Sequence, residues 1–192
     1  MVNMAKDRPR IIEAHTHDIE CLEMDPNGLH IASASKKGTI IRVFRVKDGS
    51  VLQEFRRGID NAKIMSICFD VTGQMLAVSS DSGTVHVYMI PIEGDEGDSV
   101  STSGAASIDF RNKKSRFSFF KKAIKYFDSE WSSLQLKVDE KIVFVNFNAE
   151  TSSILVYKST GKFWKHDLII KDESKPKRKF ELTEPIRLLK QS

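Results

Sequence analysis

The chain has 192 residues and is 40% hydrophobic, which supplies enough apolar side chains for a folded core and excludes an intrinsically disordered protein. Its net charge of +4 is mildly basic and does not by itself choose between nucleic acid, an anionic membrane and an acidic protein as the partner. The start has no apolar signal core and no apolar run reaches about 18 residues, so we expect neither export nor a membrane-spanning helix.

The first half of the chain contains an internal repeat, because residues 19–39 align with residues 64–84 at a constant offset of 45. Each copy reads as an apolar run, a turn, a second run, a glycine turn and a third run. Runs of this length, rich in Val, Ile and Phe, predict β-strands joined by hairpins. A period in the forties with about four strands per unit is typical of a β-propeller blade.

A weaker third copy follows at a further offset of 78. We predict blades over about 11–55, 56–138 and 139–170, with 171–192 as a basic tail or a last strand. Three blades cannot close a propeller, because exposed strand edges would remain. The chain is therefore expected to be a fragment or short isoform of a longer protein, or to borrow strand edges from another copy.

The second predicted blade carries an insertion over residues 91–128, first rich in Gly and Ser and then basic and aromatic. As a helix, its second part has one apolar stripe, which predicts insertion into a membrane interface. A helix packed on the propeller or on a partner protein is the alternative. Nucleic acid is not an expected partner, because the aromatic residues suit a stripe better than spaced stacking platforms. The stripe consists of Phe117, Phe120, Ile124 and Phe127.

Two cysteines, Cys21 and Cys68, lie inside apolar runs and are expected to be small buried residues in a reducing, cytoplasmic compartment. We expect no metal site and no cofactor. His15 and His17 lie near Cys21 in the sequence but lack a third partner, so no catalytic residue is expected either.

Adjacent arginines, Arg56 and Arg57, follow an apolar run in LQEFRRG. Neighbouring residues of a strand project to opposite faces, so two separate anion sites are the natural hypothesis. The alternative is that the arginines are solvated, or paired with the nearby Glu54 and Asp60.

The stretch LQEFRRG, lying between GTIIRVF and GTVHVY, resembles the PROPPIN family of WD-repeat, phosphoinositide-binding propellers. The resemblance runs over nearly all of residues 11–170, and KYFDSEWS resembles the strand after the family's long loop. It implies an all-β, WD-repeat-type β-propeller of about seven blades, of which this chain holds the last three.

The resemblance also implies two sites for phosphatidylinositol 3-phosphate and 3,5-bisphosphate. The first would use His15, Ser35, Thr39 and Arg56; the second would use Arg57, Ser80, Thr84 and His86. The residue types suit the ligand, since an arginine donates two parallel hydrogen bonds to a phosphate and a hydroxyl beside a glycine turn donates without bulk. His15 alone is also explained as a structural histidine of the repeat.

The resemblance further implies a peripheral scaffold on phagophore or endosomal membranes, with the long loop inserted into the membrane. It also implies a role in autophagy, with lipid-transfer or other autophagy proteins as expected partners. The alternative function is a propeller adaptor that reads acidic or phosphorylated peptides without binding lipid.

Overall fold

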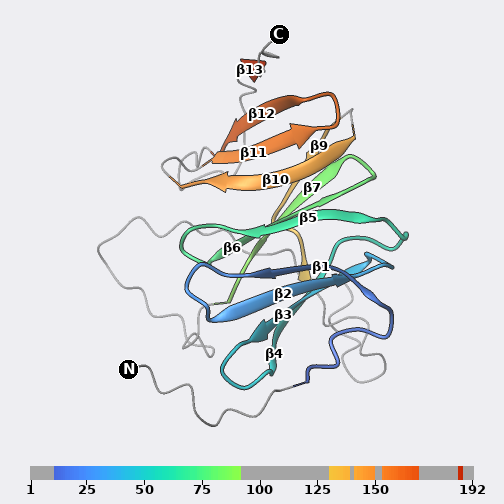
Figure 1. Cartoon of the computed structure of the whole chain (residues 1–192), viewed down its shortest axis with the longest axis vertical. Helices are drawn as coiled ribbons and strands as arrows, with labels where there is room; N and C mark the ends of the chain where they lie inside the picture. The colour runs from blue at the N-terminus through green and yellow to red at the C-terminus, as the bar shows by residue number, and fades with distance from the viewer. Residues whose placement is uncertain (1–10, 92–129, 139–140, 150–152, 169–185, 188–192) are drawn as a thin grey trace, which may run out of the picture.

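The computed structural model describes residues 11–91, 130–138, 141–149, 153–168 and 186–187. These residues form three sheets stacked face to face (Figure 1). Each sheet is built from consecutive antiparallel strands joined by tight turns. The predicted all-β fold is confirmed, and the stacked sheets are the blades of a partial β-propeller. None of the described residues belongs to a helix that could span a membrane.

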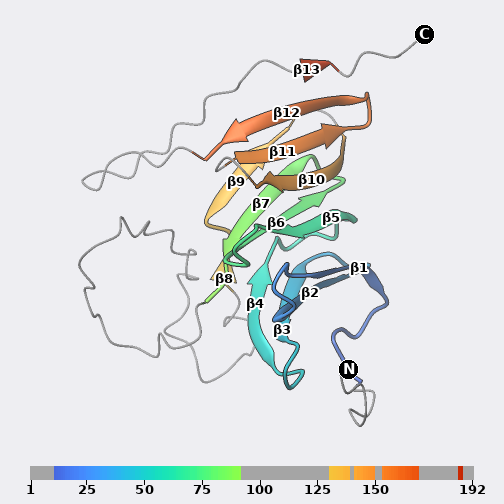
Figure 2. The same cartoon turned by 60° about the vertical axis from the view of Figure 1, so that its left-hand side comes forward.

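The first sheet has the strand order β1-β2-β3-β4-β8. Its last member arrives from a distant part of the chain and lies parallel to β4, whereas the other neighbours are antiparallel. Figure 2 shows β8 beside the end of β4. The strands are β1 (Ile19–Met24), β2 (His30–Ser35), β3 (Ile40–Arg45), β4 (Val51–Arg56) and β8 (Glu130–Trp131).

The second and third sheets repeat the four-stranded meander. The second comprises β5 (Ile64–Phe69), β6 (Met75–Ser80), β7 (Thr84–Met89) and β9 (Leu134–Lys137). The third comprises β10 (Ile142–Asn148), β11 (Ser153–Lys158), β12 (Lys162–Asp167) and β13 (Ile186–Arg187). The predicted membrane stripe of Phe117, Phe120, Ile124 and Phe127 lies outside the described residues.

Two apolar cores lie between the three sheets, because strand side chains alternate between faces. On β7, Val85 and Val87 pack in the core shared with the third sheet, while Tyr88 packs in the core shared with the first. Across this first interface Phe55 stacks on Tyr88, with ring centroids 4.7 Å apart. Burial of each such side chain contributes about 1.5–3 kcal/mol, so the stack fixes how the first two sheets meet.

The second copy of the repeat is one residue shorter than the first in the hairpin between its second and third strands. Ala34 pairs with Ile41 in the first sheet, whereas Ser79 pairs with Val85 in the second. The offset between copies is therefore 45 in the second strand and 44 in the third. As a result Arg42, not Ile41, occupies the position that His86 occupies in the second sheet.

Candidate functional site

The two adjacent arginines leave β4 on opposite sides. Phe55 points into the core toward the second sheet, so alternation places Arg56 on the other face and returns Arg57 to the side of the second sheet. Consistent with this, the Tyr88 hydroxyl of β7 donates to the backbone carbonyl of Arg56 at 3.2 Å, and the charge of Arg57 helps to lower the pKa of His86. Both arginines are buried, with 4% and 8% of their surface exposed.

Arg57 is held by backbone carbonyl groups. Its Nε donates to the carbonyl of Gly38 at 2.7 Å, and a terminal nitrogen donates to the carbonyl of Asp60. The competing carboxylate of Glu54 pairs instead with Arg42, at 2.8 Å. Because a carbonyl dipole does not cancel a full charge, these contacts orient the Arg57 guanidinium without neutralising it.

Gly38 makes this arrangement possible. Its φ is +64°, in the left-handed region that favours glycine, and an added Cβ would lie 1.8 Å from the carbonyl oxygen of Ala62. The hairpin therefore packs directly against the segment that joins the first two sheets. This close approach brings the Gly38 carbonyl within reach of Arg57.

The residues predicted for the first site, called the first set below, lie on the outer face of the first sheet, away from the second sheet. His15 shares a hydrogen bond of 2.9 Å with the hydroxyl of Ser33, and Ser35 is the next residue of β2 on that face. Burial, followed by the charge of Arg42, lowers the pKa of His15. Thr39 lies in the hairpin turn, where its carbonyl accepts the backbone N–H of Arg57 at 3.0 Å.

The second predicted set lies on the face of the second sheet that meets the first sheet. Ser80 is buried and its hydroxyl lies 2.8 Å from that of Ser82. Thr84 and His86 follow on β7, two residues apart and on the same face. The structure therefore brings Ser80, Thr84 and His86 to one face, and Arg57 approaches it from the neighbouring sheet.

His86 is a neutral hydrogen-bonding group. Its Nδ1 lies 3.1 Å from the hydroxyl of Ser132 and 3.3 Å from the amide nitrogen of Gln135. An amide nitrogen only donates, so Nδ1 accepts and the ring proton is on Nε2. Burial, then the charge of Arg57, lowers the pKa of His86 to about 4. At neutral pH the ring can offer an N–H donor but no positive charge.

The chain returns from the insertion directly beside the arginines. Glu130 and Trp131 of β8 pair with Phe55 and Arg56 of β4. Ser133 then donates its backbone N–H to the carbonyl of Val87 at 2.9 Å and leads into β9. Residues that follow the insertion are thus anchored at the boundary between the two sets.

Comparison with known proteins decides the family. A family model described as PROPPIN matches residues 5–105. The chain belongs to the PROPPIN family. Autophagy-related protein 18 of Emericella nidulans is 43% identical over 95 residues, which are 48% of this chain and 22% of that protein. SVP1-like protein 2 of Debaryomyces hansenii is 30% identical over 186 residues, which are 88% of this chain and 43% of that protein.

A solved structure agrees with this assignment. Hsv2 of Kluyveromyces marxianus matches with a TM-score of 0.67 at 25% identity, over 93% of this chain and 49% of that one. The chain spans less than half the length of the two curated relatives above. The sequence-based prediction of a PROPPIN with a β-propeller fold is confirmed.

Four further residues lie at the candidate site but were not predicted from the sequence. Ser33 and Arg42 join the first set, and Ser132 and Gln135 contact His86. The run LQLK carried a usable signal for Gln135, since its alternating leucines are buried and force the intervening polar residues to the other face. Ser132 gave no comparable signal, because only the tertiary structure brings it to His86.

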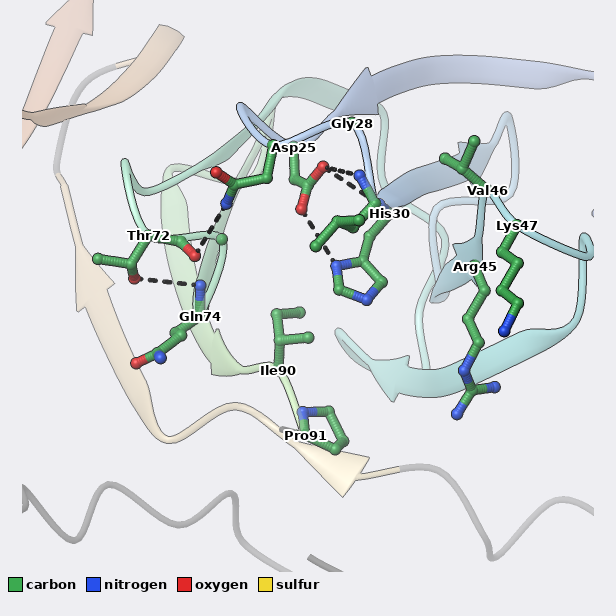
Figure 3. A pocket seen from close by; sticks show the side chains of 13 residues that line it. Asp25, Gly28, His30, Arg45, Val46, Lys47, Thr72, Gln74, Ile90 and Pro91 are labelled. Atoms are coloured by element: carbon green, nitrogen blue, oxygen red, sulfur yellow. Dashed lines mark hydrogen bonds and ion pairs between the residues drawn. The ribbon is translucent and has the colours of Figure 1, made fainter. Parts of the chain in front are cut away.

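A pocket of about 450 Å³ lies at the opposite ends of these strands, between the turns of the first two sheets (Figure 3). The carboxylate that lines this pocket, Asp25, already has hydrogen-bond partners within its own turn. Asp25 accepts the backbone N–H groups of Leu29 at 2.6 Å and His30 at 3.1 Å, and also contacts the His30 ring at 3.1 Å. Asp70 closes the matching turn of the second copy through the N–H of Met75 at 2.7 Å. These acids stabilise turns and leave the arginine edge as the candidate site.

The third sheet does not repeat the set. At the further offset of 78, Lys158 replaces Ser80 and Trp164 replaces His86. The Lys158 ammonium lies 3.9 Å from the centroid of the Trp164 ring, which is a cation–π contact. In the described part of the chain, the hydroxyl and imidazole pattern therefore belongs to the first two sheets. No group of three or more potential metal ligands occurs in that part.

The pKa of His86 predicts how stability depends on pH. In the unfolded chain the imidazole has its ordinary pKa of 6.5, and in the folded chain about 4, so the unfolded state takes up the proton first. The stabilising contribution is complete above pH 6.5 and is lost as the pH falls toward 4. Between about pH 7 and about pH 5, His86 should account for a loss of about 2 kcal/mol in the free energy of unfolding.

Urea denaturation of the wild type and of His86→Gln at both pH values measures this contribution. His15 and His166, whose pKa values are also lowered, remain in both proteins and cancel in the comparison. Equal pH dependence of the two proteins would contradict a neutral, buried imidazole at this position.

Proposed function

We propose that this chain binds the headgroups of phosphatidylinositol 3-phosphate and phosphatidylinositol 3,5-bisphosphate and acts as a peripheral membrane scaffold in autophagy. The observation that carries the proposal is the divergence of Arg56 and Arg57 onto the two faces of β4. Each face also carries hydroxyl and imidazole groups. One headgroup on each face accounts for the arginine pair without a shared ligand.

The chemistry of the two faces suits a phosphomonoester. Such a group carries a charge of about −1.5 to −2 and several strong acceptor oxygens. Arg57 offers positive charge in a buried setting, where screening by water is weak. Neutral His86 can add a donor from Nε2, and the hydroxyl of Thr84 lies on the same face. The carbonyl contacts of Arg57 orient the guanidinium before a ligand arrives.

The inserted loop supplies the second part of the proposal. Its stripe of Phe117, Phe120, Ile124 and Phe127 is proposed to enter the headgroup region of the bilayer. The anchoring of β8 next to Arg56 supports this role, because it ties the end of the insertion to the edge where the headgroups would bind. Two weak headgroup sites and one inserted loop on a single body raise each other's effective concentration.

The cellular setting is proposed from family membership. Relatives named for autophagy support recruitment to phagophore or endosomal membranes, with lipid-transfer or other autophagy proteins as partners.

Vesicle flotation tests the headgroup sites. Wild-type protein should float with phosphatidylcholine vesicles that contain either 3-phosphorylated lipid and should not float with vesicles that lack it. The variant R56A/R57A should lose binding by at least about tenfold at physiological salt, because it removes the guanidinium of both sets. The matched control is R45A/K47A, which removes the same charge at the opposite end of the first sheet.

Unchanged flotation of R56A/R57A would show that headgroups bind elsewhere. If the wild type ignores the lipid and instead binds a phosphorylated peptide through the same arginines, the adaptor function replaces the lipid-binding one.

A second experiment separates membrane insertion from headgroup binding. The variant F117S/F120S/F127S should bind vesicles about tenfold more weakly, since three aromatic side chains no longer enter the bilayer, yet should bind soluble inositol 1,3-bisphosphate as the wild type does. Phe119→Ser, which removes an aromatic residue off the stripe, is the control. Parallel loss of soluble headgroup binding would mean that the loop supports the fold and is not a membrane anchor.

A further inference from the structure

The register of the second sheet places a lysine where the first sheet has an arginine. In the first sheet Ile41 pairs with Phe55 and Ile40 with Arg56. In the second sheet Val85 pairs with Leu136 and Thr84 with Lys137. Since Ile41 and Val85 are the matching core residues of the two sheets, Leu136 corresponds to Phe55, and Lys137 corresponds to Arg56.

Lys137 is on the face that carries the second set. Leu134 and Leu136 pack in the core shared with the third sheet, so Gln135 and Lys137 project to the opposite face. Gln135 contacts His86 at 3.3 Å, which shows that this face of β9 borders the set. Lys137 is exposed and lies directly across the strand pair from Thr84.

The two sets differ in charge at matching positions. In the first sheet Arg42 pairs with Glu54, so one of its positive charges is offset by a carboxylate. In the second sheet the same two positions hold the neutral His86 and the neutral Gln135. Arg57 and Lys137 thus give the second set two positive charges. Gln135 stands where the first sheet has the carboxylate of Glu54, so no carboxylate offsets these charges at that position.

We propose that Lys137 is a headgroup-binding cation of the second set and makes this set selective for an inositol headgroup with two phosphomonoesters. This inference rests on the proposed function of the site. Arg57 directly follows Arg56, whose carbonyl accepts the Tyr88 hydroxyl of the second sheet, and Lys137 lies on β9 opposite Thr84. The two cations therefore come from neighbouring sheets and can contact separate phosphates of one ring. A lysine ammonium on a flexible stem suits the second phosphate, because it acts as a point charge without a fixed geometry.

The test measures vesicle binding of the full chain with phosphatidylinositol 3-phosphate or with the 3,5-bisphosphate. Lys137→Ala should weaken binding to the bisphosphate by about fivefold and binding to the monophosphate by less than about twofold. Lys137→Arg should restore the preference because it keeps the charge. Lys47→Ala removes an exposed lysine at the opposite edge and controls for the general field of the protein.

Several results would overturn the inference. Equal effects of Lys137→Ala and Lys47→Ala would reduce Lys137 to a general electrostatic contribution, and equal loss on both lipids would remove its role in selectivity. If Arg57→Ala removes one of two bound headgroups while Lys137→Ala changes nothing, the inference is wrong and the proposed function stands. If the wild type binds neither lipid, both are wrong.

Discussion

Alternation of side chains along a β-strand is the constraint on which this site depends. At the end of β4 it sends Phe55 into the core toward the second sheet, Arg56 to the outer face and Arg57 back toward the second sheet. The stack of Phe55 on Tyr88 holds the two sheets together at this point, and the Tyr88 hydroxyl donates to the carbonyl of Arg56 at 3.2 Å. Core packing and arginine placement are therefore one structural feature.

The electrostatics follow from what surrounds the arginines. Burial keeps His86 neutral, and the Arg57 guanidinium rests on carbonyl groups, so the second set keeps its positive charge and gains directional donors. In the first set a carboxylate is present and is paired with Arg42. Two sheets with almost the same strand pattern thus present different charge to an anion, so the two proposed sites are expected to differ in their preference.

Features that depend on neighbouring residues in the chain could be predicted from the sequence, whereas contacts between distant residues could not. Apolar runs and glycine turns located the strands, and Asp25 and Asp70 close equivalent turns because the repeat places them in the same hairpin. The one-residue difference between hairpins was not visible, since both retain the same glycine and threonine, and it moves Arg42 into the position of His86. Ser132 lies far from His86 along the chain and becomes its partner only through tertiary structure.

The central claim is that the adjacent arginines serve separate headgroups. Calorimetric titration with soluble inositol 1,3-bisphosphate measures this as the number of ligands bound per chain. The account predicts two for the wild type and one for each of Arg56→Ala and Arg57→Ala, because each variant leaves the opposite face of β4 intact. A single ligand on the wild type, or loss of all binding in either single variant, would show that the arginines share one site.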